Sequence, residues 1–216
     1  ITLRKFSDAI TTVSLEQKKE LDRREIENLL IPNGIAVSKN VSNNSRGNNH
    51  DLNNEKYILY VGRLAFQKGI EYLIKGYKES ELKNIKLKIV GDQNHALKYY
   101  ENLRELAGTD PNIEFLGYKY GEELNQLYKN SYCVVIPSES EECPMVLLEA
   151  MSFNKCIIGS KIPGIYNIAK DNVIYFESKN HHELSEKIKA VCNNELIKME
   201  YELRIKKSNI INEYDW

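Results

Sequence analysis

From residue 57 onward the chain alternates short apolar runs with helix-like stretches, and this alternation restricts the fold more than any other feature. Six strand-like runs stand at residues 57–61, 85–90, 113–116, 132–136, 156–159 and 173–176. Helical spacing is found at residues 70–77, 96–106, 122–130, 145–153, 183–191 and 195–212. The pattern predicts an α/β fold, a Rossmann-like parallel sheet with helices on both faces. Ligands bind such sheets at the carboxyl ends of the strands, so the loops after the strands are the candidate site.

The first 55 residues have a different character. Residues 15–30 are charged and helix-favouring, so they predict one helix with Ser14 as N-cap and Gln17 three residues on. A turn is expected at Pro32-Asn33-Gly34. Seven of the fifteen residues from 40 to 54 are Asn, which predicts a flexible surface loop at about residues 38–55.

Composition excludes several classes of protein. With 30 Lys and Arg against 31 Asp and Glu, the net charge of −1 gives no general attraction for nucleic acid. No apolar run approaches the ~18 residues of a membrane span. The four cysteines have neither zinc-ligand nor CxxC spacing, which favours free thiols in a reducing, cytoplasmic setting.

The loop after the first strand of the alternating region carries two glycines and two cations. Gly62 allows close backbone approach, Arg63 suits bidentate phosphate contacts, and Lys68 supplies a compact charge. It is not a Walker A loop, because Lys68 precedes Gly69 instead of following a glycine. On local sequence alone, the alternative interpretation is a solvated loop that binds nothing.

Residues 137–150 follow the fourth strand and hold four carboxylates. Pro144 suits a first helical turn, so the amides of Met145 and Val146 would be unpaired donors and a ready anion site. Glu149 stands in an apolar run and needs a partner, which a ribose or sugar diol can supply. Glu139 and Glu142 are expected only to complement the helix dipole.

Two further loops carry weaker signals. The loop from Gly91 to His95 has one glycine, so the GxGxxG fingerprint is absent, and His95 is expected at a helix start. Gly117, Tyr118 and Lys119 offer amides and an aromatic face to a planar ring, although Tyr118 suits ordinary packing equally well. No Asp lies two positions from another, so a DxD metal–diphosphate motif is absent and no metal site is predicted.

Together these segments resemble the C-terminal domain of the family-4 retaining glycosyltransferases of the two-domain B-type fold. The likeness runs in chain order through almost the whole sequence. It comprises Ile31-Pro32-Asn33-Gly34, VGRL…KG from Val61, IVGD ending at Asp92, FLG ending at Gly117, Pro137-Ser138, Glu141 with Glu149, Leu148-Glu149-Ala150-Met151, and Ile162-Pro163-Gly164.

The resemblance implies a nucleotide-sugar donor, retention at the anomeric carbon, and no essential metal or other cofactor. It assigns Arg63 and Lys68 to the donor diphosphate and Glu141 to the sugar hydroxyls, with no covalent nucleophile. The further donor-binding residues are Glu149 for the ribose, Gly117 to Lys119 for the base, the backbone of Cys143, Pro144, Met145 and Val146, and Gly62 and Asp92. UDP-sugars are the expected donors, from family frequency alone. Glu142 and Cys143 depart from the family, which commonly has Gly or Pro and then an aromatic residue there.

The resemblance also divides the chain. Residues 1–31 are expected to be the tail of a missing N-terminal acceptor domain, and residues 32–216 the donor-binding domain, inactive alone. The acceptor is an unnamed sugar, lipid or protein in polysaccharide or glycolipid biosynthesis, and peripheral membrane contact is expected only through the missing domain. A nucleotide-sugar epimerase of the same fold and a non-catalytic nucleotide-binding module are the alternatives.

Overall fold

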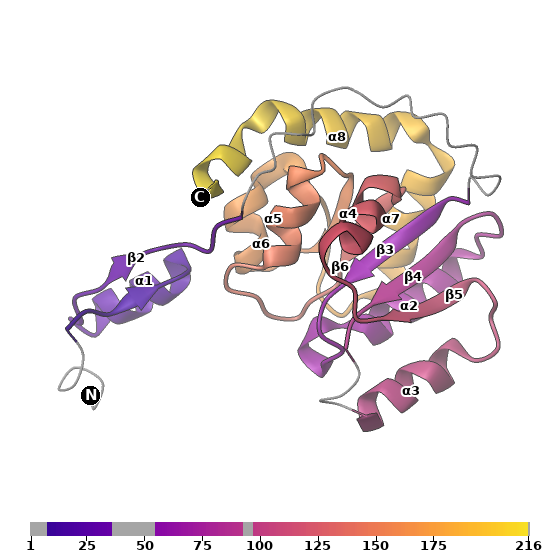
Figure 1. Ribbon diagram of the computed structural model, residues 1–216, viewed down its shortest axis with the longest axis horizontal. Helices are drawn as coiled ribbons and strands as arrows, with labels where there is room; N and C mark the ends of the chain where they lie inside the picture. The colour runs from indigo at the N-terminus through magenta and orange to yellow at the C-terminus, as the bar shows by residue number, and fades with distance from the viewer. Residues whose placement is uncertain (1–7, 36–54, 93–96, 216) are drawn as a thin grey trace.

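The computed structural model describes residues 8–35, 55–92 and 97–215. Its centre is a parallel sheet of six strands in the order β5-β4-β3-β6-β7-β8 (Figure 1). The strands are β3 (Tyr57–Val61), β4 (Lys86–Val90), β5 (Ile113–Gly117), β6 (Cys133–Ile136), β7 (Ile157–Ser160) and β8 (Ile174–Phe176). All six predicted strands are therefore present, each within a residue or so of its expected bounds, and the predicted fold class is confirmed.

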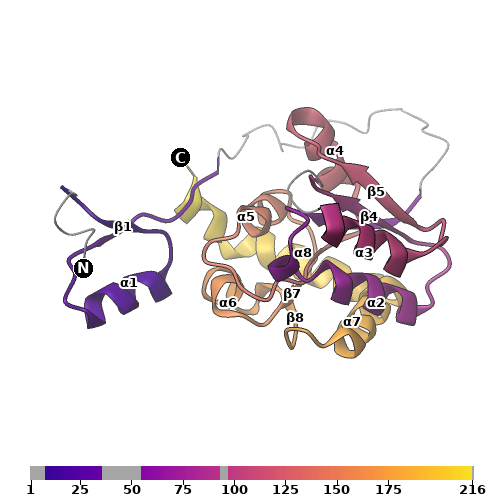
Figure 2. The same ribbon diagram turned by 90° about the horizontal axis from the view of Figure 1, so that it is seen from below.

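Helices cover both faces of this sheet (Figure 2). One face carries α2 (Ile70–Ser80), α3 (Leu97–Ala107) and α7 (His181–Asn193), and the other carries α4 (Gly121–Asn130), α5 (Met145–Ser152) and α6 (Pro163–Ala169). The predicted helix 195–212 is too long as one element, since α8 (Glu195–Ser208) ends at Asn209 in the left-handed region and a short 3-10 turn (Ile210–Tyr214) follows. Helix α6 was not predicted.

Two apolar cores form because successive strand residues point to opposite faces. In β3, Ile58 and Tyr60 pack beneath α2, while Leu59 packs on the side of α4 and α5. Each of these side chains is at most 2% exposed. A strand buried on both faces has no polar positions, which explains the near-continuous apolar runs in the sequence.

The N-terminal residues form a separate small unit, in which β1 (Thr11–Thr12) and β2 (Leu29–Leu30) pair in parallel around α1 (Leu15–Arg23). The predicted single helix over 15–30 is wrong, because α1 ends at Arg23 and Glu25 adopts a left-handed φ of 55°. The Leu29 amide then donates to the Ile10 carbonyl, 3.0 Å away. Ser14 caps α1 as predicted, accepting a hydrogen bond from the Gln17 amide at 3.2 Å.

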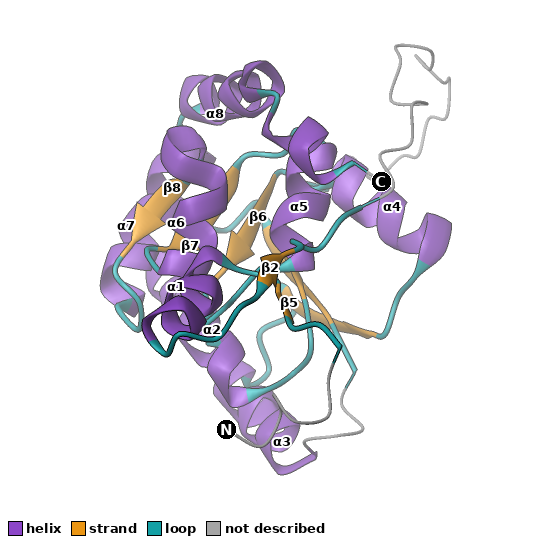
Figure 3. Ribbon diagram, turned by 90° about the vertical axis from the view of Figure 1, so that its left-hand side faces the viewer, coloured by secondary structure: helices purple, strands orange, loops and turns teal. Residues whose placement is uncertain are grey.

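This unit lies to one side of the large sheet, beside α5 and α6 (Figures 1 and 3). Residues 31–35 lead from it to the larger body, where the Ile35 amide donates to the Tyr214 carbonyl at 2.8 Å. Glu16 of α1 also accepts a hydrogen bond from Asn167 of α6. The predicted loop at residues 38–55 and the expected helix start at His95 fall outside the described residues, apart from Glu55.

Candidate donor-binding site

Two loops that follow neighbouring strands meet at the carboxyl edge of the sheet. The loop after β3 contains the 3-10 turn Phe66–Lys68 and then Gly69, whose φ is 65°. A Cβ atom at Gly69 would lie 2.1 Å from the carbonyl oxygen of Pro137, so only glycine allows this contact. The Glu139 amide also donates to the Gln67 carbonyl at 2.9 Å. The β3 loop and the β6 loop are thereby held against each other.

Lys68 and Glu141 form an ion pair across these loops. The Lys68 Nζ lies 2.5 Å from Glu141 Oε1, and the two side chains are only 18% and 11% exposed. Ser138 donates a second hydrogen bond to the same oxygen at 2.7 Å. A pair this sheltered fixes the positions of both groups. Both bonds go to Oε1 of Glu141, so neither uses Oε2. Arg63, at the start of the same loop, is exposed.

The N-terminus of α5 adjoins the ion pair. Pro144 was expected in the first turn of the helix, but it is the N-cap residue, with ψ of 117°, and α5 begins one position later at Met145. Its carbonyl accepts from the Leu147 and Leu148 amides at 3.0 and 3.4 Å. Among the described residues no side chain caps the helix, so Met145 and Val146 present the N–H groups expected of an anion site.

Glu149, one turn into α5, has the partner that its apolar surroundings require. Tyr128 of α4 donates its hydroxyl proton to Glu149 Oε2 at 2.7 Å, and its ring is 1% exposed and stacks on Phe153. Burial, with a smaller contribution from the Glu149 charge, raises the Tyr128 pKa well above its usual range. Tyr128 is therefore a hydrogen-bond donor at every ordinary pH. Sequence analysis did not indicate this residue, because its position in α4 matches ordinary core packing.

The loops after β4 and β5 continue the same edge. The Gly62 amide donates to Val90 and the Gly91 amide to Gly117, each at 3.0 Å, so the three strand ends lie side by side. Tyr118 is 68% exposed and stacks on Tyr120 with ring centroids 5.8 Å apart. That exposure rules out ordinary core packing for Tyr118 and leaves its ring open to a planar ligand. Strand β5 is two strands away from β3, so at ~4.8 Å per strand the loop that carries Tyr118 lies roughly 10 Å from the end of β3.

The remaining carboxylates of the β6 loop have partners that the sequence did not indicate. Glu139 pairs with Lys179 at 2.8 Å and accepts a hydrogen bond from Tyr72 at 3.0 Å, instead of only complementing the helix dipole. Glu142 is exposed and accepts from the Ser14 hydroxyl at the start of α1. The Glu142 carboxylate is therefore bound toward the N-terminal unit.

Two more contacts fix the backbone of this loop. The Cys143 carbonyl accepts from the Asn33 side chain at 2.8 Å, which ties the Pro32-Asn33-Gly34 turn to the β6 loop. Gly164, at the start of α6, lies so near that a Cβ atom on it would be 2.0 Å from the Glu141 carbonyl oxygen. Asp92, half-buried after β4, completes the set of predicted residues. All predicted residues thus lie on the carboxyl edge of the sheet or at the N-terminus of α5.

Comparison with known proteins identifies the family of the chain. The family described as "Glycosyl transferases group 1" matches residues 41–210 of the chain. The chain belongs to the group 1 glycosyl transferases. An uncharacterised glycosyltransferase of Methanocaldococcus jannaschii is 36% identical over 165 residues, covering 75% of this chain and 42% of that protein. The lipopolysaccharide 1,2-N-acetylglucosaminetransferase of Salmonella typhimurium is 26% identical over 195 residues, covering 75% of this chain and 51% of that protein.

Solved structures show the same fold for this group 1 domain. Anabaena HepE in complex with UDP and glucose superimposes with a TM-score of 0.84 at 18% identity, covering 98% of this chain and 60% of that one. A glycosyltransferase from Rickettsia africae gives a TM-score of 0.81 at 19% identity, covering 96% and 59%. The chain spans about half the length of the curated relatives named above, 42% and 51%. In the described residues no helix is long and apolar enough to cross a membrane.

Proposed function

We propose that this chain is the donor-binding part of a family-4 retaining glycosyltransferase, which transfers a sugar from a nucleotide-sugar to an acceptor. Residues 32–216 would form the donor-binding domain and residues 1–31 the end of an acceptor domain. A UDP-sugar is the proposed donor. The Lys68–Glu141 pair beside the N-terminus of α5 is the observation that carries this proposal.

The position of that pair within the sheet supports a nucleotide site. The chain runs outward from β3 to β4 and β5, then returns to place β6 on the other side of β3. A crevice opens where strand order reverses in this way, and open α/β sheets bind their ligands there. The loops that hold Lys68 and Glu141 follow β3 and β6, the two strands at which the order reverses, so the pair lies at this switch point.

Each group then has a role in departure of the nucleotide. Lys68 and Arg63 would bind the diphosphate together with the amides of Met145 and Val146, so that charge developing on the leaving group meets fixed positive partners. Glu141 Oε2 would accept a hydroxyl of the donor sugar, while Ser138 and Lys68 hold the other oxygen. Glu149, oriented by Tyr128, would accept the ribose hydroxyls. These cations and amides replace a metal, so transfer is proposed to need none.

The base would bind on this chain, whereas the acceptor would not. Tyr118, with Gly117 and Lys119, would contact the base beyond β4. Because the chain spans about half the length of its curated relatives, we propose that these 216 residues bind the donor but do not transfer sugar alone. The acceptor, and any contact with a membrane surface, would belong to the other half of such a protein.

Calorimetric titration of the chain with UDP, GDP and ADP, with and without EDTA, tests the proposal. Saturable binding of UDP, unchanged by EDTA, is expected for the wild type. Lys68→Ala and Glu149→Ala should each weaken it by roughly 1–3 kcal/mol, the range for a hydrogen bond to a charged group or a buried group left unpaired. Lys187→Ala, which removes an equally charged side chain from α7, is the matched control and should bind as the wild type does.

Three results would contradict parts of the proposal. Equal binding of UDP by Lys68→Ala and the wild type would place the diphosphate elsewhere. Sugar transfer by the isolated chain, with contaminating full-length enzyme excluded, would contradict the statement that the chain is inactive alone. Interconversion of one nucleotide-sugar into another by a full-length protein would favour the epimerase instead.

A further inference from the structure

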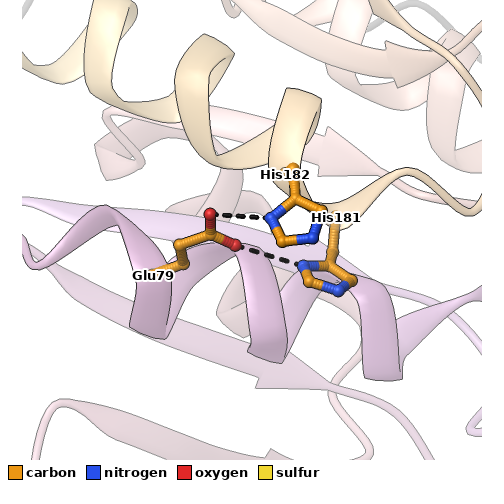
Figure 4. Close-up of side chains that lie close together, drawn as sticks. All are labelled: Glu79, His181 and His182. Atoms are coloured by element: carbon orange, nitrogen blue, oxygen red, sulfur yellow. Dashed lines mark hydrogen bonds and ion pairs between the residues drawn. The ribbon is translucent and has the colours of Figure 1, made fainter.

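Two neighbouring histidines and a glutamate come together away from the donor loops, where the start of α7 meets the end of α2. His181 Nδ1 lies 3.2 Å from Glu79 Oε2, and His182 Nδ1 lies 2.8 Å from Glu79 Oε1. The centroids of the two imidazole rings are 4.0 Å apart, and both rings face the carboxylate (Figure 4). Nothing in the proposed sugar transfer uses these three side chains.

The backbone that holds them is fixed on both sides. Gly76 lets α7 approach α2 closely, since a Cβ atom there would be 2.9 Å from the His181 carbonyl oxygen. Glu79 lies three residues further along α2 and therefore on the same helix face. At the start of α7, Asn180 accepts from the Glu183 amide at 3.1 Å, and Glu183 accepts from the Glu177 amide at 2.8 Å. The histidines thus belong to a capped helix start and not to a loose loop.

We propose that Glu79, His181 and His182 form a binding site for Zn²⁺. The ligand atoms of the three residues all lie within 4.8 Å of one another, and this is the only such group among the described residues. Zinc bonds to imidazole nitrogen and carboxylate oxygen at about 2.0–2.2 Å, so neighbouring ligand atoms in a tetrahedral site stand roughly 3.3–3.5 Å apart. The 3.2 and 2.8 Å separations need only a small widening to admit the ion.

The ligand set selects the class of metal. Two imidazoles and one carboxylate suit zinc and its borderline neighbours, whereas Mg²⁺ and Ca²⁺ prefer oxygen ligands throughout. Glu79 and His182 are 40% and 72% exposed and His181 is 29% exposed, so water can complete the coordination. The ion enters from solvent and takes the place of the Nδ1 proton that joins each imidazole to the carboxylate, and the displaced proton moves to Nε2 of a neutral ring or is released from a protonated ring to solvent.

Binding would join two helices and leave the donor site untouched. Glu79 lies nine residues beyond Ile70, so it is roughly 14 Å along α2 from the end that follows Lys68. An ion shared by α2 and α7 adds a direct link between helices whose buried side chains, Leu73 and Leu184 among them, belong to one apolar core. A ligand that binds only the folded chain raises its stability, and the gain grows with the logarithm of the free ligand concentration once this exceeds Kd. The site is therefore inferred to be structural, not catalytic.

Calorimetric titration of the untagged, EDTA-treated and desalted chain with ZnCl₂ at pH 7.5 tests this site. One ion per chain is expected. Glu79→Gln and His182→Ala should each weaken binding at least about tenfold, because even partners in the outer shell of a metal contribute roughly 10–100-fold. Glu186→Gln removes an exposed carboxylate elsewhere on α7 and is the matched control. It should bind zinc as the wild type does.

Thermal unfolding with and without ZnCl₂ gives a second measurement that does not depend on activity. Zinc should raise the melting temperature of the wild type and of Glu186→Gln, and should leave those of Glu79→Gln and His182→Ala nearly unchanged. Melting of each variant without metal shows whether it is folded. Equal zinc affinity in all four proteins, or several weakly bound ions that the substitutions do not affect, would overturn the proposal.

Discussion

Replacing Tyr128 by phenylalanine removes a single hydroxyl from the candidate site. The ring is almost fully buried and stacks on Phe153 with centroids 5.5 Å apart, so the substituted ring would keep this packing. What is lost is the 2.7 Å hydrogen bond to Glu149 Oε2. The carboxylate stays on α5, half-buried, without the donor that orients it. Any measured effect therefore reports this one interaction.

A hydrogen bond to a charged group contributes about 1.5–3 kcal/mol, and one between neutral groups about 0.5–1.5 kcal/mol. Water reaches Glu149 in part, so we expect Tyr128→Phe to lower the free energy of unfolding by about 1.5–2 kcal/mol. Tyr175→Phe is the matched control, because its hydroxyl donates to the neutral Lys170 carbonyl at 2.6 Å on an exposed side of the molecule. Its loss should be about 1 kcal/mol or less.

Urea denaturation at pH 7 measures both changes, and a double-mutant cycle with Glu149→Ala, which removes both accepting oxygens, isolates the interaction. A coupling free energy of about 1 kcal/mol or more between the hydroxyl and the carboxylate is expected. Tyr128→Phe should also weaken UDP binding, since Glu149 is then free to turn away from the ribose. The reasoning fails if Tyr128→Phe is no more destabilising than Tyr175→Phe, or if the cycle shows no coupling.

Two further predictions concern the backbone and alkaline pH. Gly69→Ala should destabilise the chain by more than Gly121→Ala. Both glycines have positive φ (65° and 56°), which costs roughly 1–2 kcal/mol, but only Gly69 adds a clash, with Pro137. Equal urea midpoints would disprove this. Burial raises the pKa of Tyr57 to about 12. The contribution of the neutral Tyr57 hydroxyl to the free energy of unfolding is therefore fully present below pH ~10. It is lost as the pH rises to ~12, by up to ~1.4 kcal/mol per pH unit. Tyr57→Phe should flatten the fall of the urea midpoint between pH 10 and 12, and an unchanged slope would contradict it.

The sheet could be predicted from sequence because its strands are buried on both faces. A run such as Tyr57 to Val61 has no polar face, so it stands out between helices that do. Helix α6 escaped because it has only seven residues and four of them are buried, which leaves little periodicity. The error over residues 15–30 has another cause. Leu29 and Leu30 form a strand by pairing with Thr11 and Thr12, and such pairing leaves no local trace in the chain.

The candidate site was predictable residue by residue but not as an assembly. Loop position indicated Lys68 and Glu141 separately, whereas their contact joins residues 73 positions apart. Glu149 was predicted to need a partner, but Tyr128 lies on a different helix and looks like any core tyrosine. Glu142 was expected only to complement the helix dipole, but it accepts a hydrogen bond from Ser14, which is 128 positions away. Contacts of this range follow from topology and not from local spacing.

The glycines that flank the β6 loop change what the short motifs of this chain mean. From sequence alone, Lys68-Gly69 is a charged residue beside a flexible one, and Pro163-Gly164 is typical of a turn. In the folded chain both glycines mark places where another backbone passes too near for any side chain, at Pro137 and at Glu141. These two positions are therefore restricted to glycine by the space that the neighbouring backbone leaves. A related chain that kept every charged residue but lost the two glycines would hold the same groups on a loop of different shape.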